Sequence, residues 1–243
     1  MDPRLMSWAH AVKSRRRQAA LAKQTGVAPR AAMAMAAAGG AGAATVAWAF
    51  TDTGRTPDVL GLVRTLPPGA GLVFRHDGVA GRLALAASAA RLCRARRITM
   101  VMTPPLIAGV GVHLRGGRHG GPRPLPGLRT SSAHSRLEVL RACRAGAGII
   151  FLSPLFDTLS HPGAIALGSL RWRRLARGGA AIYALGGVTG ATAPAIPRIA
   201  AGFGAIGSFS ASANQRCVIA ATVFRDCHDR GMPKVADLAA ARQ

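Results

Sequence analysis

Paired glycines and nearby serines in the last third of the chain form a pattern suited to holding phosphate. Gly186 and Gly187 follow an apolar run over residues 181–185, and Ser208 stands at the end of another run over residues 204–208. Glycines let backbone N–H groups approach an anion closely, and serine hydroxyls add further hydrogen-bond donors. A glycine pair is also common in a tight turn between a strand and a helix, so the pair alone leaves phosphate binding and a plain turn open.

The elements that would position these residues are visible as a repeat. From residue 46 onward, short apolar runs alternate with segments of helical periodicity about every twenty residues, which is typical of βα units around a parallel sheet. Eight such runs predict a closed (β/α)8 TIM barrel, in which the chemistry lies at the C-terminal ends of the strands. The predicted strands are residues 46–50, 71–74, 98–102, 110–114, 128–132, 148–153, 181–185 and 204–208.

The connections between these strands are uneven. Residues 81–97, 135–145 and 166–177 have the apolar spacing of amphipathic helices that cover a barrel. The segment after residue 102 contains Pro104 and Pro105 and is too short for a helix with two turns, so we expect a truncated third βα unit. Residues 115–127 are rich in Gly, Pro and Arg and predict a mobile loop.

We expect a single barrel domain over residues 46–213 with an extension at each end. Residues 1–45 predict a flexible, basic, Ala/Gly-rich tail, and residues 214–243 a C-terminal helix with a polar end. The N-terminal extension contains no predicted strand, and alanine and glycine have little area to bury. We therefore predict that it is dispensable for the fold.

The charge balance favours anionic partners. The chain has 32 Lys+Arg against 9 Asp+Glu, a formal net charge of +23, whereas its 49% hydrophobic content excludes extended disorder over most of its length. Aromatic residues make up only 5%, and the arginines are scattered apart from Arg15, Arg16 and Arg17, so neither a stacking platform nor a basic stripe is indicated. We expect small phosphorylated molecules rather than nucleic acid as partners; an arginine-rich codon bias would also explain the excess.

Neither the cysteines nor the longest uncharged segment indicates secretion or a membrane. The four cysteines form no CxxC pair and no metal-ligand spacing, which favours a reducing, cytoplasmic location. Residues 31–50 have the length of a membrane span or signal sequence. They are mainly alanine and glycine and run directly into the first predicted strand, so we expect a linker and no membrane partner.

Several strand-end motifs together point to a family. After the sixth predicted strand the sequence reads SPLFDTLSHPGA at residues 153–164, and ALGGV follows at residues 184–188. Phe74-Arg75 ends the second strand, GVHL occupies residues 111–114, and SAHS occupies residues 132–135. In this order, over residues 46–211, the motifs resemble those of the thiamine phosphate synthase and TenI family. The resemblance implies a transferase that joins hydroxymethylpyrimidine pyrophosphate to thiazole phosphate, giving thiamine phosphate and pyrophosphate.

The resemblance also implies roles for individual residues. Arg75 would grip the pyrophosphate with two hydrogen bonds, and Ser132 would supply a hydroxyl near the leaving group. An exposed arginine and a helix-capping serine are the plain alternatives for these two positions. The remaining matched positions would bind substrate phosphates: Thr158, Ser160, Gly186, Gly187 and Ser208 or its neighbour Ser210.

The sequence departs from the family pattern where Mg²⁺ would bind. The family usually holds Mg²⁺ with carboxylates after strands three and four, but the matching regions here are MTP at residues 102–104 and RGGR at residues 115–118. Two phosphate-binding lysines are replaced by Asp77 and His161. Asp52, Asp77 and Asp157 follow strands one, two and six and are candidates for a relocated Mg²⁺ site, although short acidic residues are also favoured in turns.

Three alternatives to a synthase remain at this point. TenI-type thiazole tautomerases use a histidine where this chain has Pro154, which leaves His134 as the possible proton carrier. A barrel that binds thiazole phosphate or thiamine phosphate without turnover fits binding loops that match better than the metal site. Nucleic-acid binding through residues 1–45 would appear as salt-sensitive affinity lost on their removal.

Overall fold

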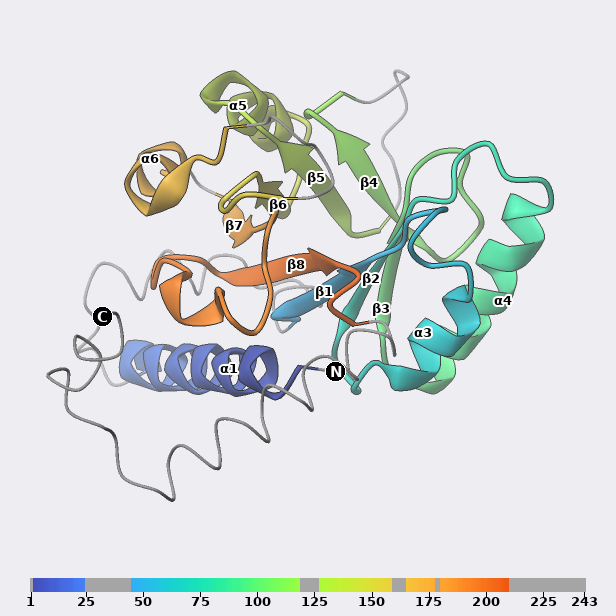
Figure 1. Ribbon diagram of the computed structural model, residues 1–243, viewed down its shortest axis with the longest axis horizontal. Helices are drawn as coiled ribbons and strands as arrows, with labels where there is room; N and C mark the ends of the chain where they lie inside the picture. Colours follow the sequence, from blue (N-terminus) through green and yellow to red (C-terminus); the bar gives the residue numbers. More distant parts are fainter. Residues whose placement is uncertain (1, 25–44, 119–126, 159–164, 178–179, 210–243) are drawn as a thin grey trace, which may run out of the picture.

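The structure, a computed structural model, confirms the predicted barrel. It describes residues 2–24, 45–118, 127–158, 165–177 and 180–209. Eight parallel strands follow one another around a closed barrel, and β1 pairs with β8 to complete it (Figure 1). The strands are β1 Ala47–Phe50, β2 Gly71–Phe74, β3 Thr99–Met102, β4 Gly111–Arg115, β5 Arg129–Ala133, β6 Ile149–Leu152, β7 Ala181–Ala184 and β8 Gly202–Ile206.

Aromatic rings fill the inside of the barrel. Phe50 and Phe151 meet edge to face with ring centroids 4.8 Å apart, and Trp48 on β1 and Tyr183 on β7 pack against Phe151 on β6. Glycine at position 71 makes room for the Trp48 ring, because a Cβ atom there would overlap the indole. The interior is therefore a packed core, as expected for a barrel of eight strands, and the open space lies at its end.

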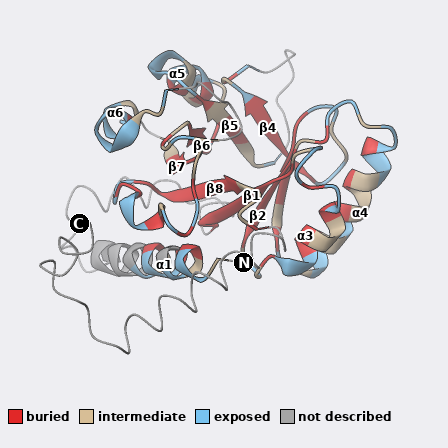
Figure 2. Ribbon diagram, viewed as in Figure 1, coloured by how far each residue is buried: buried red, intermediate tan, exposed pale blue. Residues whose placement is uncertain are grey.

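Four α-helices after β1, β2, β5 and β6 cover part of the barrel wall, each with its buried side toward the strands (Figure 2). Helices α4, Arg82–Ala95, α5, Arg136–Arg144, and α6, Gly168–Leu175, confirm the three predicted helices. Helix α3, Val59–Thr65, and the 3-10 turn η2, Ala193–Ala195, were not predicted. Seven and three residues are too short to show a clear apolar period.

The truncated third unit is confirmed, and a buried arginine occupies its place. β3 leads to β4 through residues 103–110 without a helix. Arg82, at the start of α4, donates to the carbonyl oxygen of Pro105 at 2.9 Å and to Thr103 Oγ1 at 3.0 Å. Because the side chain is only 8% exposed, these bonds fix the short connection to the neighbouring unit.

The N-terminal extension differs from the expectation. Residues Pro3–Gln24 form helix α1, which lies beside η2 (Figure 1). Leu5, Ala9 and Val12 are 0%, 3% and 1% exposed and belong to the hydrophobic core. The prediction of an unpacked tail is wrong for this helix, since three apolar residues at helical spacing are enough to dock it although basic residues surround them.

Several expectations fall outside the described residues. These are the Ala/Gly-rich residues 25–44, most of the predicted loop after β4, and the C-terminal residues 210–243. The domain limits at residues 46 and 213 therefore stay predictions. Among the helices that the structure describes, none combines the length and apolar content needed to cross a membrane.

Candidate active site

A cavity of about 830 Å³ opens at the C-terminal ends of the strands. This volume lies within the range of small-molecule sites. The loops after β1, β2, β4, β5, β6, β7 and β8 all contribute to its wall. The predicted site residues found in the wall are Arg75, Ser132, Thr158, Gly186, Gly187, Ser208 and Asp157. Ser160 lies outside the described residues.

Arg75 is held in place by the loops after β1 and β2. Its backbone N–H donates to Thr51 Oγ1 at 2.9 Å, and its Nε atom donates to the Thr51 carbonyl oxygen at 3.4 Å. The guanidinium carbon lies 5.2 Å from the centroid of the Phe50 ring. The buried ring of His76 bonds Thr51 Oγ1 at 3.0 Å and the Thr56 carbonyl oxygen at 3.2 Å, which fixes this threonine in turn.

Burial and the charge of Asp52 act in opposite directions on the pKa of Arg75. Desolvation lowers the pKa of its guanidinium, and this is the largest effect, while the negative charge of Asp52 raises it. The charge of Arg115 lowers the pKa of Arg75 further. An arginine stays protonated under such conditions, so the cavity wall keeps a fixed, partly desolvated positive charge.

The glycine pair after β7 meets the loop after β6. Gly186 and Gly187 have φ angles of 86° and 64°, a left-handed backbone that favours glycine. A Cβ atom on Gly186 would lie 2.7 Å from the Cα atom of Pro154, and one on Gly187 would overlap the Asp157 backbone. Phe156 N–H donates to the Gly186 carbonyl oxygen at 3.1 Å. Close packing of two loops thus requires these glycines, in addition to any ligand.

The same loop presents amide groups to the cavity. Within the described part of the chain, the N–H groups of Gly186, Gly187 and Val188 donate no hydrogen bond. Val188 is only 4% exposed, and a buried amide without a partner is unusual in a folded protein. Successive free amides around left-handed residues form an anion-binding concavity, so the loop is suited to a phosphate group.

Ser208 and Thr192 brace this loop from two sides. Ser208 Oγ donates to the Val188 carbonyl oxygen at 2.9 Å, and Thr192 Oγ1 donates to the Gly187 carbonyl oxygen at 2.8 Å. Both hydroxyl protons are therefore directed at the backbone. Their oxygens line the cavity, but a phosphate would receive its donors from the amides of residues 186–188.

Ser132 and His113 come from neighbouring strands. Thr130 and Ser132 share one face of β5, because alternate residues of a strand point the same way. His113 Nδ1 lies 2.8 Å from Thr130 Oγ1, and that hydroxyl donates to the Val112 carbonyl oxygen at 3.5 Å. The imidazole must then donate from Nδ1, which leaves Nε2 as an acceptor on a ring that lines the cavity.

His113 is neutral in this environment. Complete burial lowers its pKa to about 3, and the charges of Arg75 and Arg115 act in the same direction. His134 also lines the cavity but is exposed, with its Nδ1 atom 3.1 Å from Ser153 Oγ. Its backbone N–H donates to Glu138 Oε2 at 2.6 Å at the start of α5. The cavity thus contains one buried and one accessible imidazole.

The carboxylates proposed for a relocated metal do not converge. Asp52 Oδ1 accepts the N–H groups of Gly54 at 3.1 Å and Arg55 at 3.2 Å, so this side chain forms a turn. Asp77 accepts a 2.7 Å hydrogen bond from Thr103 Oγ1 and also pairs with Arg82 and Arg115.

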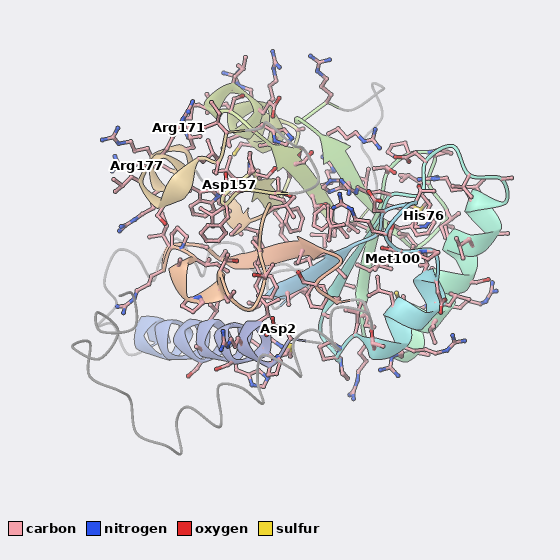
Figure 3. All side chains as sticks on the ribbon, in the orientation of Figure 1. Asp2, His76, Met100, Asp157, Arg171 and Arg177 are labelled. Carbon is pink, nitrogen blue, oxygen red and sulfur yellow. The ribbon has the colours of Figure 1, made fainter. Side chains whose placement is uncertain are left out.

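Asp157 lies in a different part of the barrel from Asp77. Asp157 belongs to the loop after β6, whereas His76, which precedes Asp77 in the sequence, lies near α3 and α4 (Figure 3). Of the three candidates, Asp157 is the only one in the cavity wall. Among the described residues, no group of three or more His, Cys, Asp or Glu side chains could hold a metal ion. The described donor set therefore does not fit a Mg²⁺ site built by the protein.

Comparison with known proteins finds similarity among solved structures. No protein-family model and no curated protein sequence matches the chain. Among solved structures, the thiamine phosphate pyrophosphorylase from Pyrococcus furiosus matches with a TM-score of 0.58 and 18% sequence identity, over 71% of this chain and 91% of that one. The match shows the fold. At this identity it confirms the (β/α)8 architecture expected from the motifs and leaves the reaction to be proposed.

The cavity wall also contains basic residues that were not among the predicted site residues, including Arg55, His113, Arg115 and Arg118. His113 and Arg115 belong to β4, where the GVHL motif had been noted only as a sign of the family. Because site residues gather at strand ends, the last residue of β4 could have been selected from the barrel alone. Arg55 and Arg118 lie in loops, for which the sequence contains no such signal.

Proposed function

We propose that the chain is a thiamine phosphate synthase-like transferase that joins hydroxymethylpyrimidine pyrophosphate to thiazole phosphate, in the cytoplasm. The observation that carries the proposal is the cavity at the strand ends. Its wall brings together a half-buried arginine, a glycine loop with free amides and the Ser132 hydroxyl, taken from loops far apart in the sequence. The fold of a thiamine phosphate pyrophosphorylase agrees with this use of the cavity.

The two phosphorylated substrates would occupy opposite sides of the cavity. The amides of residues 186–188 would hold the thiazole phosphate, and Arg75 would hold the pyrophosphate of the pyrimidine substrate. The bond from the pyrimidine methylene carbon to the pyrophosphate oxygen breaks, and pyrophosphate leaves with the electron pair. The thiazole nitrogen then forms the new C–N bond with that carbon.

Arg75 and Ser132 would assist by stabilising charge. Negative charge develops on the pyrophosphate as it leaves, and a fixed guanidinium and a hydroxyl donor stabilise that charge without having to reorganise. The neutral His113 contributes no positive charge that would oppose a cationic pyrimidine methylene. Its free Nε2 is an acceptor suited to an amino group on the pyrimidine ring.

The direct test measures thiamine phosphate formed from both purified substrates. We expect turnover in the parent chain and a fall of about tenfold to a hundredfold in Arg75→Gln, the usual loss for a charged hydrogen bond to a transition state. Arg91→Gln is the matched control, since Arg91 on α4 is exposed and bonds only Ser88 Oγ, at 3.0 Å. Absence of product from parent protein that binds both substrates would reject the transferase.

One specific observation favours a second candidate, a barrel that binds thiazole phosphate or thiamine phosphate without turnover. The glycine loop offers three free amides, whereas the described carboxylates do not form the metal site expected of the synthase. The same assay separates the two functions, because binding without product supports the second and product formation excludes it.

A further inference from the structure

The cavity wall contains four arginines: Arg55, Arg75, Arg115 and Arg118. They come from the loops after β1, β2 and β4, so one side of the cavity is strongly positive. The carboxylates in the described wall are Glu138 and Asp157. Glu138 accepts a 2.6 Å hydrogen bond from the His134 backbone, and Asp52 and Asp77, outside the wall, offset part of the positive charge of Arg75 and Arg115.

Three of these guanidinium groups are close enough to act on one another. Desolvation lowers the pKa of Arg75 most; the charges of Arg115 and Arg55 lower it further, while those of Asp52 and Asp77 raise it. Desolvation also lowers the pKa of His113 most, and the charges of Arg75 and Arg115 act in the same direction. Like charges gathered in a partly desolvated site raise the free energy of the empty cavity. An anion bound among them removes that repulsion, so the arrangement favours a ligand with several negative charges.

The neighbouring carboxylates position the arginines rather than bind a metal. Asp77 pairs with Arg82 and Arg115 and accepts the Thr103 hydroxyl. It contacts Arg115 through Nη2, and within the described residues the other N–H groups of that guanidinium have no partner and can face a ligand. A guanidinium with its plane fixed in this way can bind phosphate oxygens with two parallel hydrogen bonds.

We propose that these arginines bind the diphosphate group of the substrate directly and replace a divalent cation as its counter-charge. The inference rests on the proposed function for the identity of the substrate, but it concerns how the diphosphate is held. Charge neutralisation of a diphosphate requires cations close to its oxygens, and guanidinium groups supply them without metal ligands. Among the described residues, no group of three or more His, Cys, Asp or Glu side chains could hold a metal ion in their place.

The test uses inorganic pyrophosphate as the probe and calorimetry as the measurement, with the full chain in EDTA and again in excess Mg²⁺. We expect pyrophosphate to bind in EDTA. Arg115→Gln and Arg118→Gln should each weaken binding by about tenfold or more, and Arg115→Lys by less than Arg115→Gln because it keeps the charge. Arg91→Gln removes the same charge from an exposed site outside the cavity and should change the affinity by less than about twofold.

The outcomes distinguish the arginine site from the proposed synthase reaction. If pyrophosphate binds only when Mg²⁺ is present, or if Arg91→Gln weakens binding as much as the cavity variants, the proposal is wrong even in an active synthase. If pyrophosphate binds in EDTA but no thiamine phosphate forms, the arginine site stands and the proposed reaction fails. Should Arg115→Gln fail to fold because Asp77 loses a partner, Arg118→Gln decides the matter, since Arg118 is exposed.

Discussion

Removal of helix α1 should destabilise the barrel markedly. Leu5 and Val12 are 0% and 1% exposed, and a fully buried aliphatic side chain contributes about 1.5 to 3 kcal/mol. Together they predict a loss of about 3 to 6 kcal/mol in the free energy of unfolding. At about 2 to 4 °C per kcal/mol for a chain of this size, a variant beginning at Thr45 should melt roughly 6 to 24 °C below the parent.

Thermal unfolding followed by circular dichroism measures this difference directly. Leu5→Ala should account for about 2 to 5 kcal/mol by itself, the usual cost of removing a buried leucine side chain. Leu170→Ala on α6 is the matched control, because that side chain is 75% exposed and its removal should cost little. A truncated chain that melts within about 3 °C of the parent would show that α1 is not part of the core, and the reasoning from burial would be refuted.

Three further changes test the site. His113→Gln should make unfolding less sensitive to acid. The pKa of His113 in the folded parent, about 3, lies below the usual histidine value, so the parent should lose roughly 1.4 kcal/mol of unfolding free energy per pH unit as the pH falls below about 6.5. Urea titrations at several pH values would show that the unfolding free energy of the variant changes less steeply with pH. Gly187→Ala should lower both the melting temperature and the affinity for thiazole phosphate. Gly78→Ala is the control and should lower the melting temperature alone, because the φ angle of Gly78, 74°, is also left-handed but a Cβ there would meet nothing within 4 Å. Unchanged phosphate binding by Gly187→Ala would exclude this loop as the phosphate site. Asp77→Asn should cost about 1 to 3 kcal/mol because it weakens the hydrogen bonds and ion pairs that join three loops, and an unchanged urea midpoint would contradict that role.

The barrel was predictable because its signal repeats. Each strand is a short apolar run, and eight runs at regular spacing leave few alternatives to a closed parallel sheet. The observed strand bounds differ from the predicted ones by two residues or fewer, the largest shift being at β8, where Gly202 and Phe203 extend the strand toward its start. Helix α1 escaped prediction because its three buried residues stand among basic and polar neighbours, and only the tertiary contacts reveal that they pack on the barrel.

The site was predictable only where the family motifs cover it. Arg75, Ser132 and the glycine pair were selected from strand ends and do line one cavity. The ion pairs of Asp77 could not be predicted, because one partner, Arg82, lies on α4 and the other, Arg115, lies at the end of β4. A carboxylate that directly follows a strand lies at the C-terminal face of the barrel. Whether it can bind a ligand depends on the side chains that reach it from other βα units.

The same consideration explains how the proposed site could bind phosphate without metal ligands. The phosphate binding proposed for the β7 loop would depend on backbone amides, which any sequence supplies once the glycines allow the turn. Metal binding depends on several carboxylates converging, and one basic partner per carboxylate is enough to prevent it, as Arg115 and Arg82 do for Asp77. In a chain with 32 basic and 9 acidic residues, such partners are abundant. A charge balance of this kind therefore favours arginine over a metal ion as the counter-charge for a diphosphate.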